Sequence, residues 1–105
     1  MAMNPQFETI KTILLQKFRA KAIYIFGSAA NGTDGNGSDI DLCVVLDLKG
    51  RRKIEVMRAI RQALARSIEL PLDILVYSED EFESRAKIRS TLEHVIAEKG
   101  FKLYG

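Results

Sequence analysis

Three aspartates occur in apolar segments that otherwise have the composition of β-strands. Asp39 and Asp41 stand two residues apart at the start of one segment, and Asp73 lies between apolar neighbours in another. Acidic residues are depleted in strands, and side chains two residues apart in a strand leave it on the same face. Asp39 and Asp41 would therefore repel each other unless a cation lay between them.

These carboxylates have two interpretations. In the first, Asp39 caps a loop and Asp73 pairs with an arginine. In the second, all three converge where neighbouring strands adjoin, and their oxygens bind a hard divalent cation. We favour the second interpretation. The sequence offers no set of His or Cys ligands beside them, which indicates Mg²⁺ or Mn²⁺ rather than zinc.

A Gly-Ser pair could supply the other half of such a site. Gly27 and Ser28 directly follow the apolar run of residues 22–26. A glycine lets the backbone approach a ligand closely, and a helical turn beginning at Ser28 would direct free N–H groups at an anion. Such pairs are usually simple turns. In combination with the three aspartates, however, the pair predicts a phosphate cradle beside a metal.

The apolar spacing predicts the elements that position these residues. Helices are expected over residues 5–19, 50–67 and 78–99, and strands over residues 22–26, 40–46 and 71–77. The predicted inner face of the middle helix is Ile54, Met57, Ile60, Leu64 and Ile68. The predicted inner face of the last helix is Phe82, Ile88, Leu92, Val95 and Ile96. The order α-β-β-α-β-α indicates an α/β or α+β domain with helices packed on a small sheet.

Composition narrows the class of protein. The 105 residues predict a single domain over residues 1–105, and 47% hydrophobic with 29% charged residues is typical of a globular chain. No apolar run is long enough for a membrane span, no secretory signal is evident, and the single cysteine fits a reducing cytoplasm. A net charge of +2 without interleaved aromatic residues makes nucleic acid an improbable partner.

The spacing of the motifs resembles one known family. Gly27-Ser28, followed after ten residues by Asp39-Ile40-Asp41 and later by Asp73 on an apolar strand, is similar to the signature of the DNA polymerase β-like nucleotidyltransferases. The short chain and the run over residues 26–32 resemble the minimal nucleotidyltransferases in particular. The resemblance covers nearly the whole chain.

The resemblance implies a polymerase β palm-like fold with a mixed sheet. It also implies two divalent ions, Mg²⁺ or Mn²⁺, and ATP as the substrate. The metal-binding and catalytic residues would be Asp39, Asp41 and Asp73. The nucleotide-binding residues would be Gly27, Ser28 and Ser38.

Minimal members of the family resemble antitoxins of HEPN-domain toxins, which implies transfer of AMP from ATP to a hydroxyl of that partner protein. One departure supports an alternative, because this chain has Asn31 where many members have arginine. An antitoxin with a weak or inactive site would neutralise its toxin by binding alone. A third possibility is transfer to a small molecule or an RNA end, for which relatives usually need a further domain.

Other conspicuous residues have plainer interpretations. The arginines and lysines of residues 51–66 are expected to form a solvated helix face, with docking of an acidic partner or RNA as the alternative. His94 is expected at the surface or boundary, and Cys43 as a small buried hydrophobe. Phe101 and Tyr104 either pack onto the domain or offer an apolar patch to a partner.

Overall fold

The computed structural model describes residues 5–27, 40–69 and 71–105. Its elements, in chain order, are α1 (Pro5–Phe18), β1 (Ala22–Phe26), β2 (Ile40–Val45), α2 (Lys53–Ala65), β3 (Leu72–Tyr77), α3 (Glu79–Ala86), α4 (Leu92–Lys99) and β4 (Phe101–Tyr104). None of the helices within these ranges is long and apolar enough to cross a membrane.

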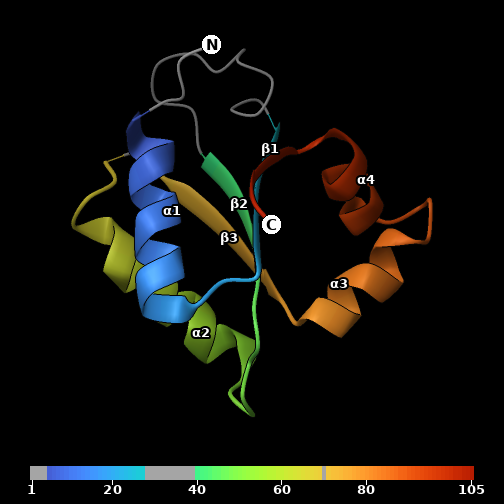
Figure 1. Ribbon diagram of the computed structural model, residues 1–105, viewed down its shortest axis with the longest axis horizontal. Coiled ribbons are helices and arrows are strands. Elements are labelled where there is room, and N and C mark those ends of the chain that lie inside the picture. Colours follow the sequence, from blue (N-terminus) through green and yellow to red (C-terminus); the bar gives the residue numbers. More distant parts are fainter. Residues whose placement is uncertain (1–4, 28–39, 70) are drawn as a thin grey trace.

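The four strands form one mixed sheet in the order β3-β2-β1-β4 (Figure 1). β1 runs antiparallel to both β2 and β4, whereas β2 and β3 are parallel. The parallel pair is joined through α2, as a crossover between parallel strands requires. The predicted fold class, helices packed on a small mixed sheet, is confirmed.

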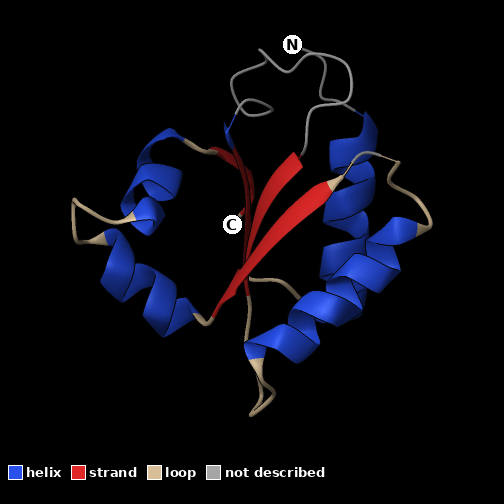
Figure 2. Cartoon of the chain, turned by 180° about the vertical axis from the view of Figure 1, so that it is seen from behind, coloured by secondary structure: helices blue, strands red, loops and turns tan. Residues whose placement is uncertain are grey.

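The helices cover the two faces of the sheet in pairs, with α1 and α2 on one face and α3 and α4 on the other (Figure 2). Strand alternation divides the core accordingly. Leu42 and Val44 join the cluster beneath α1 and α2, whereas Cys43 and Val45 join the cluster beneath α3 and α4. Asp41 has the same parity as Cys43 and so belongs to the α3–α4 face.

The inner face of α2 differs from the predicted one. Val56, Ile60 and Leu64 are its buried residues, while Ile54 is 45% exposed. Positions four apart share a helix face, and Ile54 lies two positions before Val56, which turns it toward the opposite side. The predicted helix over residues 50–67 is also longer than the observed one, Lys53–Ala65.

The predicted helix over residues 78–99 is in fact two helices, α3 and α4. Ser78 caps α3 as expected, because its hydroxyl accepts a hydrogen bond from the Glu81 N–H at 3.2 Å. A second cap, at Thr91, begins α4 in the same way with the His94 N–H. The break turns three residues of the predicted inner face outward, namely Ile88, Leu92 and Val95.

The sequence analysis did not predict the last strand, β4. Gly100 ends α4 as expected, and the chain then pairs with β1 through Phe101 opposite Ile25 and Lys102 opposite Tyr24. Leu103 is the buried residue of this strand, whereas Phe101 and Tyr104 stay more than a third exposed. The two aromatic residues therefore lie on an edge strand of the sheet.

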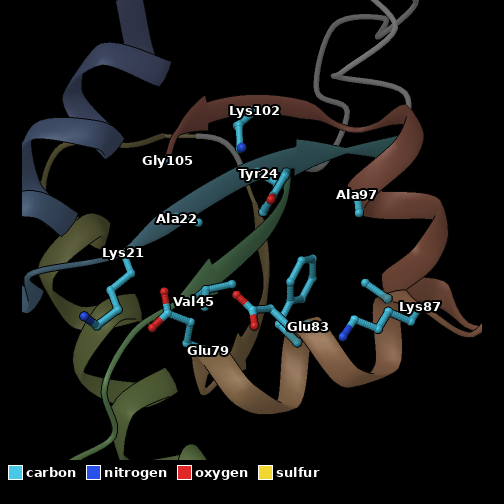
Figure 3. A pocket seen from close by; sticks show the side chains of 12 residues that line it. Lys21, Ala22, Tyr24, Val45, Glu79, Glu83, Lys87, Ala97, Lys102 and Gly105 are labelled. Carbon is cyan, nitrogen blue, oxygen red and sulfur yellow. The ribbon is translucent and has the colours of Figure 1, made fainter.

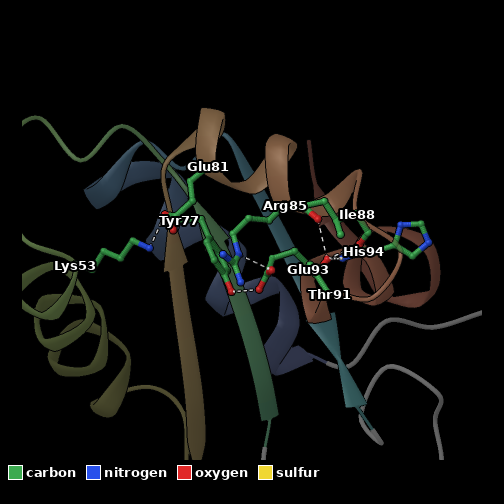
Figure 4. Close-up of polar contacts among 8 residues, drawn as sticks. All are labelled: Lys53, Tyr77, Glu81, Arg85, Ile88, Thr91, Glu93 and His94. Carbon is green, nitrogen blue, oxygen red and sulfur yellow. Dashed lines mark hydrogen bonds and ion pairs between the residues drawn. The ribbon is translucent and has the colours of Figure 1, made fainter.

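A buried carboxylate ties α3 and α4 to the sheet (Figure 4). Glu93 is 4% exposed and accepts hydrogen bonds from the Tyr77 hydroxyl at 2.5 Å and from the Arg85 Nε at 2.7 Å. Burial disfavours this carboxylate, but the two hydrogen bonds outweigh burial and hold the pKa of Glu93 below its ordinary value. The charged form is therefore the one that the fold stabilises.

Because the pKa of Glu93 is lowered by folding, its contribution to stability is present above the pKa of the unfolded chain and is lost as the pH falls through the folded value. We expect Glu93→Gln to lower the free energy of unfolding at pH 7 by about 1–3 kcal/mol. The difference from wild type should shrink below pH ~4. Urea unfolding between pH 7 and pH 3 measures both, with the exposed Glu98→Gln as the matched control. A difference that stayed constant with pH would contradict this role for the charge.

Candidate active site

Two of the three predicted aspartates lie side by side. Asp41 in β2 is the register partner of Asp73 in β3. Neighbouring strands are separated by about 4.8 Å, and register partners project from the same face, so the two side chains leave the sheet together. Asp41 is half-buried and Asp73 is exposed to solvent. The strand pairing thus places two carboxylates at one end of the α3–α4 face.

Gly27 brings the backbone against this pair. It directly follows β1, whose last residue, Phe26, is the register partner of Asp41. Its φ angle is +75°, a left-handed conformation that favours glycine. A Cβ atom at this position would overlap the Oδ2 atom of Asp41. A glycine is therefore required here both by the backbone conformation and by the approach of the carboxylate.

The remaining predicted site residues lie outside the described residues. They are Ser28, Ser38 and Asp39, together with Asn31. The described part of the site consists of two carboxylates, whose oxygens are hard ligands. The carboxylate of Asp41 is packed against Gly27, and that of Asp73 is open to solvent. This donor set fits Mg²⁺ or Mn²⁺, which prefer carboxylates and retain water ligands.

Arg61 in α2 supports the strand that carries Asp73. Its Nη1 donates a hydrogen bond of 3.0 Å to the carbonyl oxygen of Leu72, the residue before Asp73. β3 is an edge strand of the sheet. Its carbonyl groups that point away from β2 therefore have no neighbouring strand and need another hydrogen-bond donor. The sequence analysis assigned Arg61 to a solvated helix face. It could not predict the contact, because Arg61 and Leu72 are eleven residues apart and no sequence pattern links them.

Cys43 and His94 have side chains that can do chemistry, but in this fold their surroundings are those of structural residues. Cys43 is fully buried, and burial raises the pKa of its thiol to about 12, so the thiolate form that could react is suppressed. His94 is partly buried, and its Nδ1 lies 2.8 Å from the carbonyl oxygen of Ala86, between α3 and α4. Both observations agree with the predicted interpretations of these residues.

A hollow of about 410 Å³ on the same face lies away from the carboxylates (Figure 3). It is lined by Ala22 at the first position of β1 and by Val45 at the last position of β2, whereas Asp41 pairs with the other end of β1. The charged side chains that surround it are of both signs, namely Lys21, Glu79, Glu83, Lys87 and Lys102. This hollow is separate from the candidate site. Because charged groups of both signs line it, it does not favour anionic ligands over cationic ones, or the reverse.

Comparison with known proteins identifies the family. The model of the family described as "Polymerase beta, Nucleotidyltransferase" matches residues 8–99 of the chain. No curated protein sequence matches.

Several solved structures share the fold, among them the following three. A mutant form of the MntA–HpeT toxin–antitoxin pair superposes with a TM-score of 0.66 at 20% identity, over 98% of this chain and 74% of that one. A toxin–antitoxin structure with AMP-PNP gives a TM-score of 0.55 at 22% identity, over 94% and 73%. A structure assigned as a nucleotidyltransferase from Sulfolobus solfataricus gives 0.51 at 25% identity, over 74% and 68%.

The family match extends over most of the chain, including Gly27 and the strands that carry Asp41 and Asp73. It agrees with the mixed sheet of the fold. The chain belongs to the polymerase β nucleotidyltransferase family.

Proposed function

We propose that this chain transfers AMP from ATP to a hydroxyl group of a HEPN-domain toxin, in a reaction that depends on Mg²⁺. The observation that carries the proposal is the register pairing of Asp41 with Asp73 beside Gly27, in a member of a nucleotidyltransferase family. Two neighbours in fold are toxin–antitoxin structures, one of them with AMP-PNP, which supports the choice of partner and of nucleotide.

In this proposal the three aspartates, Asp39, Asp41 and Asp73, hold two divalent ions, and Gly27, Ser28 and Ser38 hold the triphosphate. When bound, the two ions would stabilise the attacking and leaving oxygens of an in-line displacement. The close packing of Gly27 on Asp41 leaves no room for a side chain at residue 27, so the backbone there lies directly against the carboxylate.

Asp73 is the residue best placed to receive a proton, because its carboxylate is the exposed member of the pair. The acceptor oxygen forms a bond to the α-phosphorus of ATP, and the bond from that phosphorus to the bridging oxygen of the β-phosphate breaks. Pyrophosphate leaves with that electron pair, and the hydroxyl proton passes to Asp73.

A second candidate function is neutralisation by binding alone. Asn31 favours it, since many members of the resembling family carry arginine at this place and an asparagine lacks the positive charge that attracts phosphate. The retained pair of Asp41 and Asp73 favours an active enzyme instead.

The experiment that separates the two uses ATP labelled at the α-phosphate, Mg²⁺ and a purified HEPN-domain partner protein. Label should pass to the partner with the wild-type chain and should be absent with Asp73→Asn. Inhibition of the partner by both proteins to the same degree, without label, would instead establish neutralisation by binding.

Arg61 is expected to act on the same reaction as a positioning residue. Removing groups that orient metal ligands typically costs 10–100-fold in activity or metal affinity. Arg61→Met removes the hydrogen bond to Leu72 and should lower kcat by about 10-fold with little change in the KM for ATP. Arg61→Lys should restore part of the loss.

The control for this prediction is Arg58→Met, an exposed arginine of the same helix. Initial rates over a range of ATP concentrations give kcat and KM separately. An Arg61→Met variant that matched Arg58→Met in both constants would show that the Leu72 contact has no part in placing Asp73.

A further inference from the structure

The hollow of about 410 Å³ beside Tyr24, which we call the Tyr24 hollow, has the size of a small-molecule site. Such sites in proteins have volumes of roughly 300–1,000 Å³. Small side chains leave the space open, because Ala22, Ala86 and Ala97 line it from β1, α3 and α4. It lies at the end of β1 that is distant from Asp41, so a ligand bound here would not contact the carboxylate pair.

The hydroxyl of Tyr24 is a polar group that lacks a protein partner in this hollow. The side chain is only 9% exposed and projects from β1 toward α3 (Figure 3). Within the part of the chain that the structure describes, its hydroxyl makes no hydrogen bond, whereas the hydroxyl of Tyr77 donates to Glu93. Burial raises the pKa of Tyr24, so its hydroxyl stays protonated and can donate. Because buried polar groups usually have a partner, this hydroxyl indicates one from outside the chain.

Two aromatic rings form an apolar wall of the Tyr24 hollow. The rings of Tyr24 and Phe82 are stacked, with centroids 5.3 Å apart and an angle of 26° between their planes. Val45 and the three alanines extend the apolar surface around them. A wall of this kind stabilises the apolar or aromatic body of a ligand by removing it from water.

Charged side chains of opposite sign face each other across this hollow. Glu79 and Glu83, four residues apart on α3, lie on one side, and Lys102 of β4 lies on the other, with its Nζ 5.9 Å from the centre of the tyrosine ring (Figure 3). Lys21 and Lys87 stand at the two ends. Among the described residues no ion pair joins these groups. A ligand of one charge would be attracted by one side and repelled by the other, whereas a zwitterion would be attracted by both.

We propose that the Tyr24 hollow binds a free α-amino acid with an aromatic or apolar side chain. Its carboxylate would accept a hydrogen bond from the Tyr24 hydroxyl and meet Lys102. Its ammonium group would meet Glu79 and Glu83, and its side chain would lie against Phe82. Hydrogen bonds between charged groups are stronger than neutral ones, so both ends of the ligand contribute to affinity. The proposal does not rest on the proposed function, because the hollow is separate from the carboxylate pair.

The test titrates L-phenylalanine into the isotope-labelled chain and follows the amide signals by nuclear magnetic resonance. We expect saturable shifts at Tyr24, Phe82 and Lys102, with a Kd on the order of 1 mM. Phenylpropionate retains the ring and the carboxylate, and phenethylamine retains the ring and the ammonium group. Each should bind about 10-fold more weakly than L-phenylalanine, because each lacks one charged hydrogen-bonding group.

Charge variants assign the two ends of the ligand. Glu79→Gln/Glu83→Gln should weaken binding of L-phenylalanine and phenethylamine about 10-fold and leave that of phenylpropionate unchanged. Lys102→Gln should weaken binding of L-phenylalanine and phenylpropionate and leave that of phenethylamine unchanged. Thermal unfolding checks that each variant is folded.

A substitution at the hydroxyl tests the hydrogen bond alone. Tyr24→Phe keeps the ring and should raise the Kd for L-phenylalanine about 3–10-fold. The matched control is Tyr104→Phe, because Tyr104 is an exposed tyrosine of β4 that does not line the hollow.

Three results would overturn the proposal. They are shifts that do not saturate by about 10 mM, equal affinity for the three compounds, and a Tyr24→Phe variant that binds as tightly as Tyr104→Phe. The titration contains no nucleotide and no partner protein, so its outcome is independent of whether the chain transfers AMP.

Discussion

Asp41→Asn is expected to lower nucleotidyl transfer on the order of 10³-fold or more while the chain stays folded. The substitution keeps the shape of a half-buried side chain and removes its charge beside Asp73. Loss of a group that only orients a metal ligand costs 10–100-fold, so loss of a proposed ligand should cost more. A 10³-fold loss corresponds to about 4 kcal/mol of transition-state stabilisation.

The measurement is the initial rate of label transfer at saturating ATP and Mg²⁺, with thermal unfolding recorded in parallel. Asp47→Asn is the matched control, because Asp47 is an exposed aspartate beyond the other end of β2. If Asp41→Asn retained the rate of Asp47→Asn, the assignment of Asp41 to the catalytic machinery would be wrong.

The second large effect is expected at Gly27. A Cβ atom there would overlap the Oδ2 atom of Asp41, and the φ angle of +75° is unfavourable for alanine. Gly27→Ala should displace the Asp41 carboxylate and lower the transfer rate by about 10²-fold, the cost of a misplacement of about 1 Å at a reacting group. It should also lower the free energy of unfolding by about 1–3 kcal/mol.

Gly50 offers a control that separates the two causes. Its φ angle is +77°, but a Cβ atom there would meet nothing within 4 Å. Gly50→Ala therefore has the same backbone strain without the overlap. Both variants should lose stability, and the loss of rate should be confined to Gly27→Ala. Equal rates in the two variants would show that the contact between Gly27 and Asp41 is not needed for the reaction.

Local patterns were enough to single out Asp41 and Asp73, the two candidate residues that the strand pairing brings together. An aspartate in an apolar strand is unusual at either position, and the run Leu72-Asp73-Ile74 has the alternation of a strand with one polar face. The alignment of Asp41 with Asp73 could not be predicted in the same way. Periodicity assigns each residue to a face, but the register of a parallel pair depends on contacts distant in sequence.

The sequence does contain a signal that the predicted helix over residues 78–99 is divided in two, but the spacing of its apolar residues favoured one continuous helix. Ile88, Leu92 and Val95 follow one another at intervals of four and three, which a continuous helix would also produce. The Ser90-Thr91 pair marks a new N-cap, and Thr91 does accept the capping hydrogen bond. The buried position of Glu93 had no such signal, because its partners, Tyr77 and Arg85, come from β3 and α3.

The short strand β4 was missed for a different reason. Of its four residues Leu103 is buried, and the other three are exposed. A run this short on an edge strand has too little alternation to be distinguished from an irregular tail. Its position depends on the open edge of β1, a property of the assembled sheet.

The pairing of Asp41 and Asp73 as metal ligands is tested most directly by nuclear magnetic resonance with substoichiometric Mn²⁺ and ATP. Paramagnetic Mn²⁺ broadens the signals of nearby amides. We expect the amides of Gly27, Asp41 and Asp73 to broaden first, those of Val45 and Tyr77 at the other ends of the same strands to broaden last, and Asp73→Asn to weaken the effect. Broadening centred elsewhere, such as on the acidic first turn of α3, or equal broadening along β2 and β3, would contradict the assignment.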